Sequence, residues 1–298
     1  MHNTGGPGTG KTEAIIHATY RAAEVGARVL ILCPKGALVH ANRERLPPTD
    51  QIVVETLHSG FSIARKVDLD TYSPPGRLRR YDLIFIDEAS QIGDAIFDCI
   101  IVGIRELPQK PFVVVGVDYQ QVAPIGGGTV GQSLCDSIKT IELTVVHRTD
   151  DPELLAFLFM ARVKQPARGE IRDLFGDRLL KCSLVEAVKF GLSIYDRTGK
   201  LFVWLCVTNK GVRDVNIAAI SQLSPPITEA DLLSRGFPTD PNVGKNGYIV
   251  IRPGITIRLT RNIDKERGFV NGAIAVVCDM LEDYNPSEGR HTVYLRHD

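Results

Sequence analysis

Short apolar runs alternate with amphipathic segments along the first half of the chain. Three runs rich in Val, Ile and Leu are typical of buried strands: residues 27–33, 81–87 and 111–117. Residues 12–26 and 90–107 instead place apolar side chains at helical spacing, and Gly26 is a residue type that ends helices. Strands that alternate with helices predict an α/β fold with a parallel sheet covered on both faces.

A second series of elements begins near Ile141. We expect a helix at 152–163, a strand at 200–208 and a helix at 209–223. A loop-like stretch at 224–247 is followed by three β-type runs, at 254–260, 268–281 and 291–297. These changes predict a first domain of residues 1–144 and a second of residues 145–298. A β-barrel-like insert should begin near residue 249.

Composition narrows the class of protein. The 298 residues include 35 Lys and Arg and 35 Asp and Glu, and 44% are hydrophobic. This balance is that of a globular chain with a core, and it excludes a protein that holds nucleic acid by bulk charge alone. It leaves room for a local basic groove.

Cysteine usage and the absence of targeting signals indicate an intracellular protein. The six cysteines form no CxxC pair and lie mostly in apolar runs, so we expect buried free thiols rather than disulfides or zinc. No signal peptide and no apolar run of membrane-spanning length is visible, so we expect no membrane partner. The location would be the nucleus or mitochondrion in a eukaryote and the cytoplasm in a bacterium.

The sharpest chemical signal is GGPGTGKT, which fits the pattern GxxxxGK[ST] before a helix. Its residues are the predicted ATP-binding set: Gly5, Gly6, Pro7, Gly8, Thr9, Gly10, Lys11 and Thr12. Backbone N–H groups would surround the β-phosphate, Lys11 would reach the β- and γ-phosphates, and Thr12 would ligate Mg²⁺. An ordinary glycine turn is the disfavoured alternative. Met-His-Asn-Thr is a poor strand, so the strand that usually precedes such a loop should be clipped.

Two later strand ends carry polar residues. In LIFIDEAS, Asp87 would hold Mg²⁺ and Glu88 would act as general base toward the attacking water, although helix N-capping also explains acids there. In VVVGVDYQQVAPIGGG, a strand delivers Asp118, Gln120, Gln121 and Pro124 to a loop. Gln121 could sense the γ-phosphate, and a polar Gly/Pro loop explains this segment equally well by itself.

Taken in order, these three segments resemble motifs I, II and III of superfamily 1 helicases. Gln121 matches the motif III glutamine and Pro124 its proline, while Val117 stands where the family has glycine. Residues 30–46 and 56–64 resemble the motif Ia and T-x-H-S segments. LTVVHRTDDPELLAFL resembles the motif that carries the first arginine finger, at Arg148.

The C-terminal part of the chain resembles one branch of this superfamily in particular. Residues 254–277 resemble the N-x-x-x-G-x-x-N-G segment of RecD-like and Pif-one-type helicases. The resemblance implies two RecA-like P-loop NTPase domains, the second incomplete and β-rich at its C-terminus, with Arg148 reaching over from the second. The family's last motif is absent before Asp298. We therefore expect a fragment that binds ATP but unwinds duplex poorly.

The implied function is an ATP- and Mg²⁺-dependent DNA helicase that moves 5′-to-3′ on single-stranded DNA, as a monomer, in DNA repair or recombination. DEASQ, residues 87–91, also occurs in Upf-like RNA helicases, so an RNA helicase is the alternative within the same class of enzymes. A decayed fragment that only binds nucleotide or nucleic acid is the alternative of another class.

Nucleic-acid contacts are the least defined part of the site. By analogy with the family, His58 would touch the backbone and Asn271 would contact the strand; a capping or core histidine and a type I′ turn at Asn271-Gly272 are the alternatives. Phe61 and Phe269 are candidates for base stacking. The cluster Arg77, Arg79 and Arg80 is better explained as a solvated loop than as a DNA-facing patch.

Overall fold

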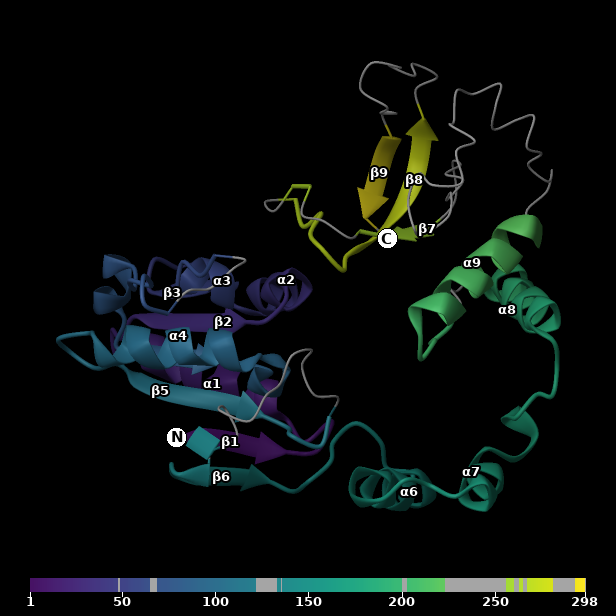
Figure 1. Ribbon diagram of the computed structural model, residues 1–298, viewed down its shortest axis with the longest axis horizontal. Helices are drawn as coiled ribbons and strands as arrows, with labels where there is room; N and C mark the ends of the chain where they lie inside the picture. The colour runs from purple at the N-terminus through teal and green to yellow at the C-terminus, as the bar shows by residue number, and fades with distance from the viewer. Residues whose placement is uncertain are drawn as a thin grey trace. The chain divides into compact units, whose positions relative to one another are not determined.

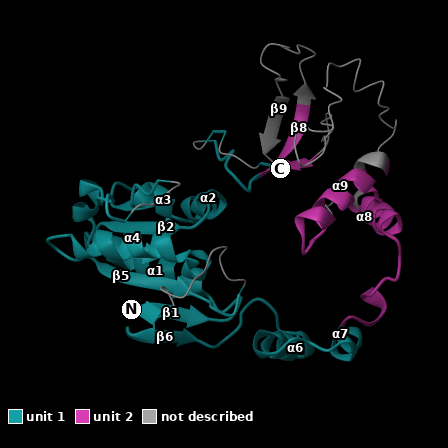
Figure 2. Ribbon diagram, in the orientation of Figure 1, with its two compact units in different colours: residues 1–174, 258–273 teal, residues 175–257, 274–298 magenta. Residues whose placement is uncertain are grey.

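The computed structural model describes the chain in two compact units (Figure 1). The described residues are 1–47, 49–64, 69–121, 133–134, 136–199, 203–222, 256–259, 263–264, 267–280 and 293–297. Unit 1 comprises residues 1–174 and 258–273, and unit 2 comprises residues 175–257 and 274–298 (Figure 2).

Unit 1 is built on a six-stranded parallel sheet with the strand order β3-β2-β4-β5-β1-β6. Its strands are β1 (His2–Gly5), β2 (Val29–Cys33), β3 (Ile52–Thr56), β4 (Leu83–Ile86), β5 (Phe112–Val117) and β6 (Thr140–Leu143). Every residue of β2 is buried, as a strand covered on both faces requires. The predicted α/β class with a parallel sheet is confirmed.

Unit 1 also contains helices between and after its strands. They are α1 (Lys11–Glu24), α2 (Gly36–Arg45), α3 (Leu57–Gly60), α4 (Asp94–Arg105), α6 (Pro152–Val163) and α7 (Arg168–Phe175), with short 3₁₀ turns at Gly76–Arg80 and Ala89–Gln91. A third 3₁₀ turn, Gly176–Arg178, lies in unit 2. Gly26 has a φ of 85° just beyond α1, as expected for a residue after a helix end. The helix predicted at 90–107 begins only at Asp94, because residues 89–91 form a separate 3₁₀ turn.

Alternate residues of β2 pack into two separate hydrophobic cores. Leu30 and Leu32 pack with Phe97 and Ile100 of α4, whereas Val29 and Ile31 belong to the cluster that also contains Ile15 and Ile16 of α1. This period of two places one hydrophobic layer on each face of the sheet. The carboxyl ends of the parallel strands are thereby held rigidly at one edge, where ligand sites of such sheets form.

Two strands correct the sequence-based picture. The prediction that Met-His-Asn-Thr makes a poor strand is wrong, because His2–Gly5 forms β1 between β5 and β6. Strand β6 contains Ile141, near which the second series of elements was expected to begin, and it pairs with β1 in the first sheet, within the predicted first domain of residues 1–144. Unit 1 also contains α6 and continues to residue 174, beyond the boundary predicted at residue 144.

The described part of unit 2 holds two helices, and β-structure lies near the C-terminus. The elements are α8 (Leu184–Thr198), α9 (Asn209–Gln222) and the sheet β7 (Thr256–Arg258), β8 (Ile274–Met280) and β9 (Val293–His297). Strands β8 and β9 are antiparallel, and the β-rich C-terminus is confirmed. The strand expected at 200–208 is not formed by its described residues, 203–208. The loop expected at 224–247 lies outside the described residues, and the second RecA-like domain of residues 145–298 stays a prediction.

Burial of the thiols differs between the units. Cys33 and Cys99 are buried as expected, but Cys182 and Cys278 are exposed, so the expectation of buried thiols is wrong for the latter two. In the described part of the chain, no helix combines the length and apolar character needed to cross a bilayer.

Candidate nucleotide-binding site

The glycine loop joins β1 to α1 and depends on glycine for its shape. Gly8 and Gly10 have φ angles of 78° and 88°, in the left-handed region that favours glycine. A Cβ atom at Gly8 would lie 2.6 Å from the Cβ of Arg148, so a side chain could not fit there. The loop therefore presents bare backbone at the start of α1, as phosphate binding requires.

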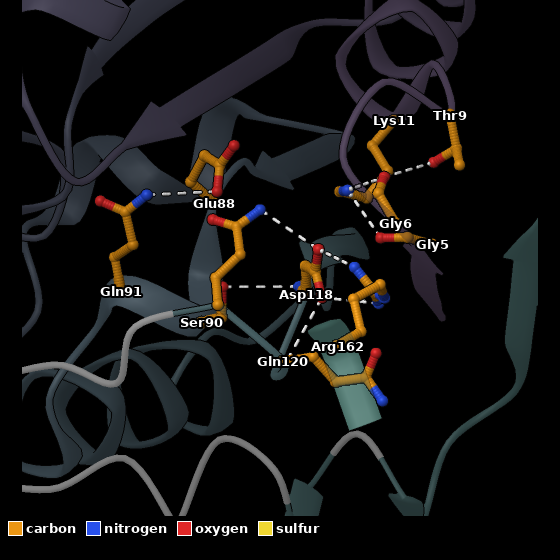
Figure 3. Close-up of polar contacts among 11 residues, drawn as sticks. Gly5, Gly6, Thr9, Lys11, Glu88, Ser90, Gln91, Asp118, Gln120 and Arg162 are labelled. Atoms are coloured by element: carbon orange, nitrogen blue, oxygen red, sulfur yellow. Dashed lines mark hydrogen bonds and ion pairs between the residues drawn. The ribbon is translucent and has the colours of Figure 1, made fainter. Parts of the chain in front are cut away.

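Lys11 is held in the loop by backbone carbonyls. Its Nζ donates to the oxygens of Gly5 at 2.8 Å and Gly6 at 3.0 Å (Figure 3). Burial lowers the pKa of Lys11, and the nearby carboxylates of Asp118 and Glu88 oppose that shift. The ammonium group thus lies on the loop, where it can exchange carbonyl partners for phosphate oxygens.

Thr12 and Asp87 meet across the site. The Thr12 hydroxyl donates to Oδ2 of Asp87 at 3.2 Å, although the two residues lie 75 positions apart. Asp87 is buried directly after β4, and burial raises its pKa, followed by repulsion from Glu88; the Thr12 hydrogen bond opposes the rise. A hydroxyl and a carboxylate are the hard oxygen donors that Mg²⁺ takes in nucleotide sites, so these two residues fit that ion.

Glu88 has an unusual backbone conformation for a residue other than glycine. Its φ and ψ are 52° and 40°, in the left-handed region, where such residues cluster at functional sites. Its Oε2 accepts a hydrogen bond from Nε2 of Gln91 at 3.2 Å. Glu88 precedes the 3₁₀ turn at Ala89–Gln91, but its side chain makes no capping hydrogen bond. The helix-capping alternative therefore does not explain Glu88.

Asp118 and Gln121 follow β5 at the same edge of the sheet. Asp118 is buried, and Nε2 of Gln121 donates to its Oδ2 at 3.2 Å. Val117, which replaces the family's glycine, is the buried last residue of β5. Pro124 lies outside the described residues. The structure thus brings Gln121 close to Asp118, and Asp118 in turn is close enough to Lys11 to influence its charge.

Sequence reasoning overlooked Arg162 of α6. Its Nη1 and Nη2 atoms donate to Oδ2 and Oδ1 of Asp118 at 2.9 and 3.0 Å (Figure 3). The available signal for Arg162 was a cationic residue near the end of a mostly apolar helix, PELLAFLFMARV. Its partner could not be identified from the sequence, because Asp118 lies 44 residues earlier.

The segment with Arg148 also packs on the glycine loop. The backbone N–H of His147 donates to the Gly8 carbonyl at 2.8 Å, and Arg148 is exposed. Both residues belong to unit 1, so the expectation that Arg148 reaches over from a second domain does not match the division into compact units. Its role as an arginine finger stays a prediction.

The segments of the two predicted nucleic-acid residues lie near one hollow in unit 1, of about 110 Å³. Its lining comes from α2, β3, α3 and the 270–273 turn: Gly36, Val39, His40, Arg43, Glu55, Thr56, Ser59 and Val270. His58 is exposed on α3, and Asn271 is exposed on the turn. A Cβ at Gly272 would lie 3.6 Å from the Cβ of Ala37.

That turn differs from the expected type I′ geometry. Only Gly272 has a positive φ, of 95°, and the Ala273 N–H donates to the Val270 carbonyl at 3.0 Å. Type I′ requires positive φ at both central residues, so the turn is of type II character, with glycine at its third position.

Arg77 and Phe61 have structural positions. Arg77 forms a two-pronged ion pair with Glu55, at 2.8 and 2.7 Å, and also donates to the Ser59 carbonyl. It therefore supports α3 and is not part of a solvated loop. Phe61 is 0% exposed in the core, so the prediction that it stacks on bases is wrong. Phe269 is partly buried.

Known proteins are similar to this chain in sequence. Residues 1–172 match a family model described as an AAA domain. An ATP-dependent RecD2 DNA helicase of Deinococcus radiodurans is 28% identical over 171 residues, which are 57% of this chain and 22% of that protein. ATP-dependent DNA helicase PIF1 of Xenopus laevis is 26% identical over 221 residues, 67% of this chain and 32% of that protein. The chain thus spans less than two thirds of the length of these relatives.

Solved structures confirm the fold. One solved structure, of two coordinating Pif1 helicases that unwind forked double-stranded DNA, aligns with 98% of this chain. The alignment spans 71% of the Pif1 chain, with a TM-score of 0.60 and 19% sequence identity. Pif1 helicase from Candida albicans covers 94% of this chain and 65% of its own, with a TM-score of 0.59 and 17% identity. The chain belongs to the AAA domain family, on the RecD-like and Pif1-type branch of superfamily 1 helicases.

Proposed function

We propose that this chain binds and hydrolyses ATP and uses the energy to move along single-stranded DNA, in a 5′-to-3′ DNA helicase. The observation that carries the proposal is the convergence of Lys11, Thr12, Asp87, Glu88 and Gln121 at the carboxyl ends of neighbouring parallel strands. Phosphoryl transfer needs positioning and charge neutralisation more than covalent chemistry, and these residue types supply both.

Each side chain has a defined task in this proposal. Lys11 would leave the Gly5 and Gly6 carbonyls for the β- and γ-phosphate oxygens of ATP. Glu88 would accept a proton from the attacking water, with its carboxylate oriented by Gln91. Mg²⁺, held through Thr12 and Asp87, would offset the negative charge of the phosphates.

The two remaining polar residues act on the γ-phosphate. Gln121 would orient the water without competing as a base. Arg148, which is exposed beside the glycine loop, would complete the charge compensation.

The proposed nucleic-acid contact involves the hollow formed by α2, α3 and the 270–273 turn. These segments are far apart in the sequence, and they present polar and backbone groups on one face of unit 1. His58 and Asn271 would contact the sugar-phosphate backbone there. Because such contacts ignore base identity, they suit a motor that passes any sequence. With zero net charge, binding should rest on a few local contacts and weaken as salt rises.

An ATPase assay with and without single-stranded DNA tests the proposal. We expect hydrolysis that increases with single-stranded DNA and disappears in Lys11→Ala, since the loop then lacks its cation. Lys164→Ala is a control, because Lys164 is an exposed lysine of unit 1 outside the glycine loop that pairs with Glu170. Equal binding of a triphosphate analogue by Lys11→Ala and the parent would overturn the assignment.

The Upf-like RNA helicase is the second candidate, on the strength of DEASQ at residues 87–91. A parallel assay with single-stranded RNA of the same sequence separates the two. Stronger stimulation by RNA would favour the RNA helicase. Nucleotide binding without any stimulation by either polymer would favour the decayed fragment.

A further inference from the structure

The carboxylate of Asp118 accepts four hydrogen bonds. Two come from Nη1 and Nη2 of Arg162, one from the backbone N–H of Gln120 at 3.2 Å, and one from Nε2 of Gln121 at 3.2 Å. The Asp118 side chain is 1% exposed and that of Arg162 is 20% exposed. A buried carboxylate with paired charge and complete hydrogen bonding is held in one orientation.

Arg162 also lies against the glycine loop. A Cβ atom at Gly6 would lie 3.3 Å from Nη1 of Arg162 and 3.6 Å from its Cζ. The same guanidinium group therefore binds the Asp118 carboxylate and lies close to Gly6 of the glycine loop. It comes from α6, whose first residue follows the segment that packs on Gly8.

The opposite charges of Asp118 and Arg162 both act on Lys11. Asp118 is the strongest of the carboxylates that act on Lys11, and Arg162 acts on Lys11 with the opposite sign. Without Arg162, a buried negative charge would remain beside the site that receives a triphosphate. It would attract Lys11 away from the phosphates, and it would repel their oxygens in a medium of low effective dielectric constant.

Gln121 depends on the same carboxylate. Its side-chain amide donates to Oδ2 of Asp118, the oxygen that also accepts from Nη1 of Arg162. If Asp118 turned, the amide would lose its anchor, and the predicted contact of Gln121 with the γ-phosphate would lose its orientation.

We propose that Arg162 is a positioning residue for the triphosphate: it neutralises and orients Asp118, and through Asp118 it holds Gln121 at the γ-phosphate position. The inference rests on the proposed function of the loop as an ATP site. Because both effects concern the terminal phosphate, Arg162 should matter for ATP and much less for ADP.

The test compares the affinity of the chain for fluorescent ADP and for a non-hydrolysable fluorescent ATP analogue, with Mg²⁺ present. For Arg162→Gln we expect the ATP analogue to bind about tenfold more weakly while ADP binding stays within about twofold. Arg162→Lys keeps the charge but not the two-pronged geometry, so it should recover part of the loss. Arg45→Gln is the matched control, because Arg45 pairs with Glu13 on the exposed surface of α2 and α1.

A variant of Asp118 distinguishes an electrostatic role of the Arg162–Asp118 pair from a purely structural role. Asp118→Asn removes the negative charge but keeps an acceptor for Gln121, so the ATP analogue should bind at least as tightly as to the parent. In the double variant, Asp118→Asn should restore most of the affinity that Arg162→Gln loses. If the pair only supported the fold, the single Asp118 variant would weaken binding like Arg162→Gln, and the double variant would not recover.

The outcomes are distinguishable. If the parent binds both nucleotides and Arg162→Gln binds them equally well, or loses both to the same extent, this inference is wrong and the ATP site stands. If the parent binds neither nucleotide, the proposed function fails and the inference with it. Should Arg162→Gln unfold at the assay temperature, Arg162→Lys and Asp118→Asn still decide, because Arg162→Lys should weaken binding of the ATP analogue and Asp118→Asn should not.

Discussion

The described parts of units 1 and 2 differ in how much core supports them. Unit 1 has a hydrophobic cluster on each face of its parallel sheet. In the described part of unit 2, α8 and α9 share a cluster with only three buried members, Val188, Val215 and Ala218. Apolar side chains such as Phe190, at 46% exposure, remain uncovered on α8.

The distribution of predicted chemistry follows the distribution of core. Every predicted nucleotide-binding residue and Arg148 belong to unit 1. A phosphate site needs side chains held within a fraction of an ångström, and a sheet packed on both faces supplies that rigidity. A pair of helices that buries three residues is marginal by itself. The comparison therefore predicts that nucleotide binding and the packing of α8 on α9 can be disturbed separately.

The largest expected effect is Phe97→Ala in the core of unit 1. Phe97 is 1% exposed, and its loss should lower the free energy of unfolding by about 3–5 kcal/mol and abolish nucleotide binding near physiological temperature. A urea titration that follows binding of a fluorescent nucleotide measures both the loss of stability and the loss of binding. Phe112→Ala is the control, because Phe112 of β5 is 56% exposed. Equal effects of the two variants would contradict the assigned core.

Glu88→Gln should change turnover and leave the fold intact. The amide keeps the shape and the hydrogen bond to Gln91 but is no longer a base, so hydrolysis should fall by about 10²-fold or more. That factor corresponds to about 2.7 kcal/mol of barrier height. Nucleotide affinity should stay near that of the parent. Loss of affinity in the same proportion would assign Glu88 a structural role.

Val188→Ala addresses unit 2 alone. Val188 is 0% exposed, and removal of two methyl groups should cost about 1.5 kcal/mol. Trp204 is the only tryptophan of the chain and packs against this cluster, so its fluorescence reports the local transition. Val185→Ala, at an exposed position of α8, is the control. If nucleotide binding weakened together with the tryptophan signal, the two units would not be independent.

Arg77→Gln should have the smallest effect, and it depends on pH. The hydrogen bonds and charge of Arg77 lower the pKa of Glu55 in the folded chain. The pair therefore stabilises the fold above the unfolded pKa of Glu55, and this stability is lost as pH falls through the lower folded pKa. We expect a loss of about 1–2 kcal/mol at neutral pH that decreases in acid and disappears once the pH lies below the lowered folded pKa of Glu55. Thermal unfolding across pH measures it, with exposed Arg79→Gln as the control; a pH-independent difference would contradict the ion pair.

Local sequence determined the elements whose signals are short-range. The loop from Gly5 to Thr12, the strand that ends just before Asp87 and the helix at 152–163 were predictable, because glycine positions, apolar runs and helical spacing act over a few residues. The same holds for the order of the motifs, which by itself indicated the superfamily.

Tertiary structure decided what depends on partners distant in sequence. His2–Gly5 is a weak strand in isolation, and it forms because β5 and β6 offer hydrogen bonds on both sides. Strand β6 joins the first sheet for the same reason. Unit 1 continues through α6 to residue 174. Arg162 gained its importance only through Asp118, 44 residues away. Phe61 could be a stacking residue or a core residue by its type, and the packing of α3 and α4 determined that it is core. Burial and charge pairing are properties of the assembled fold, since they arise from contacts that no short stretch of chain contains.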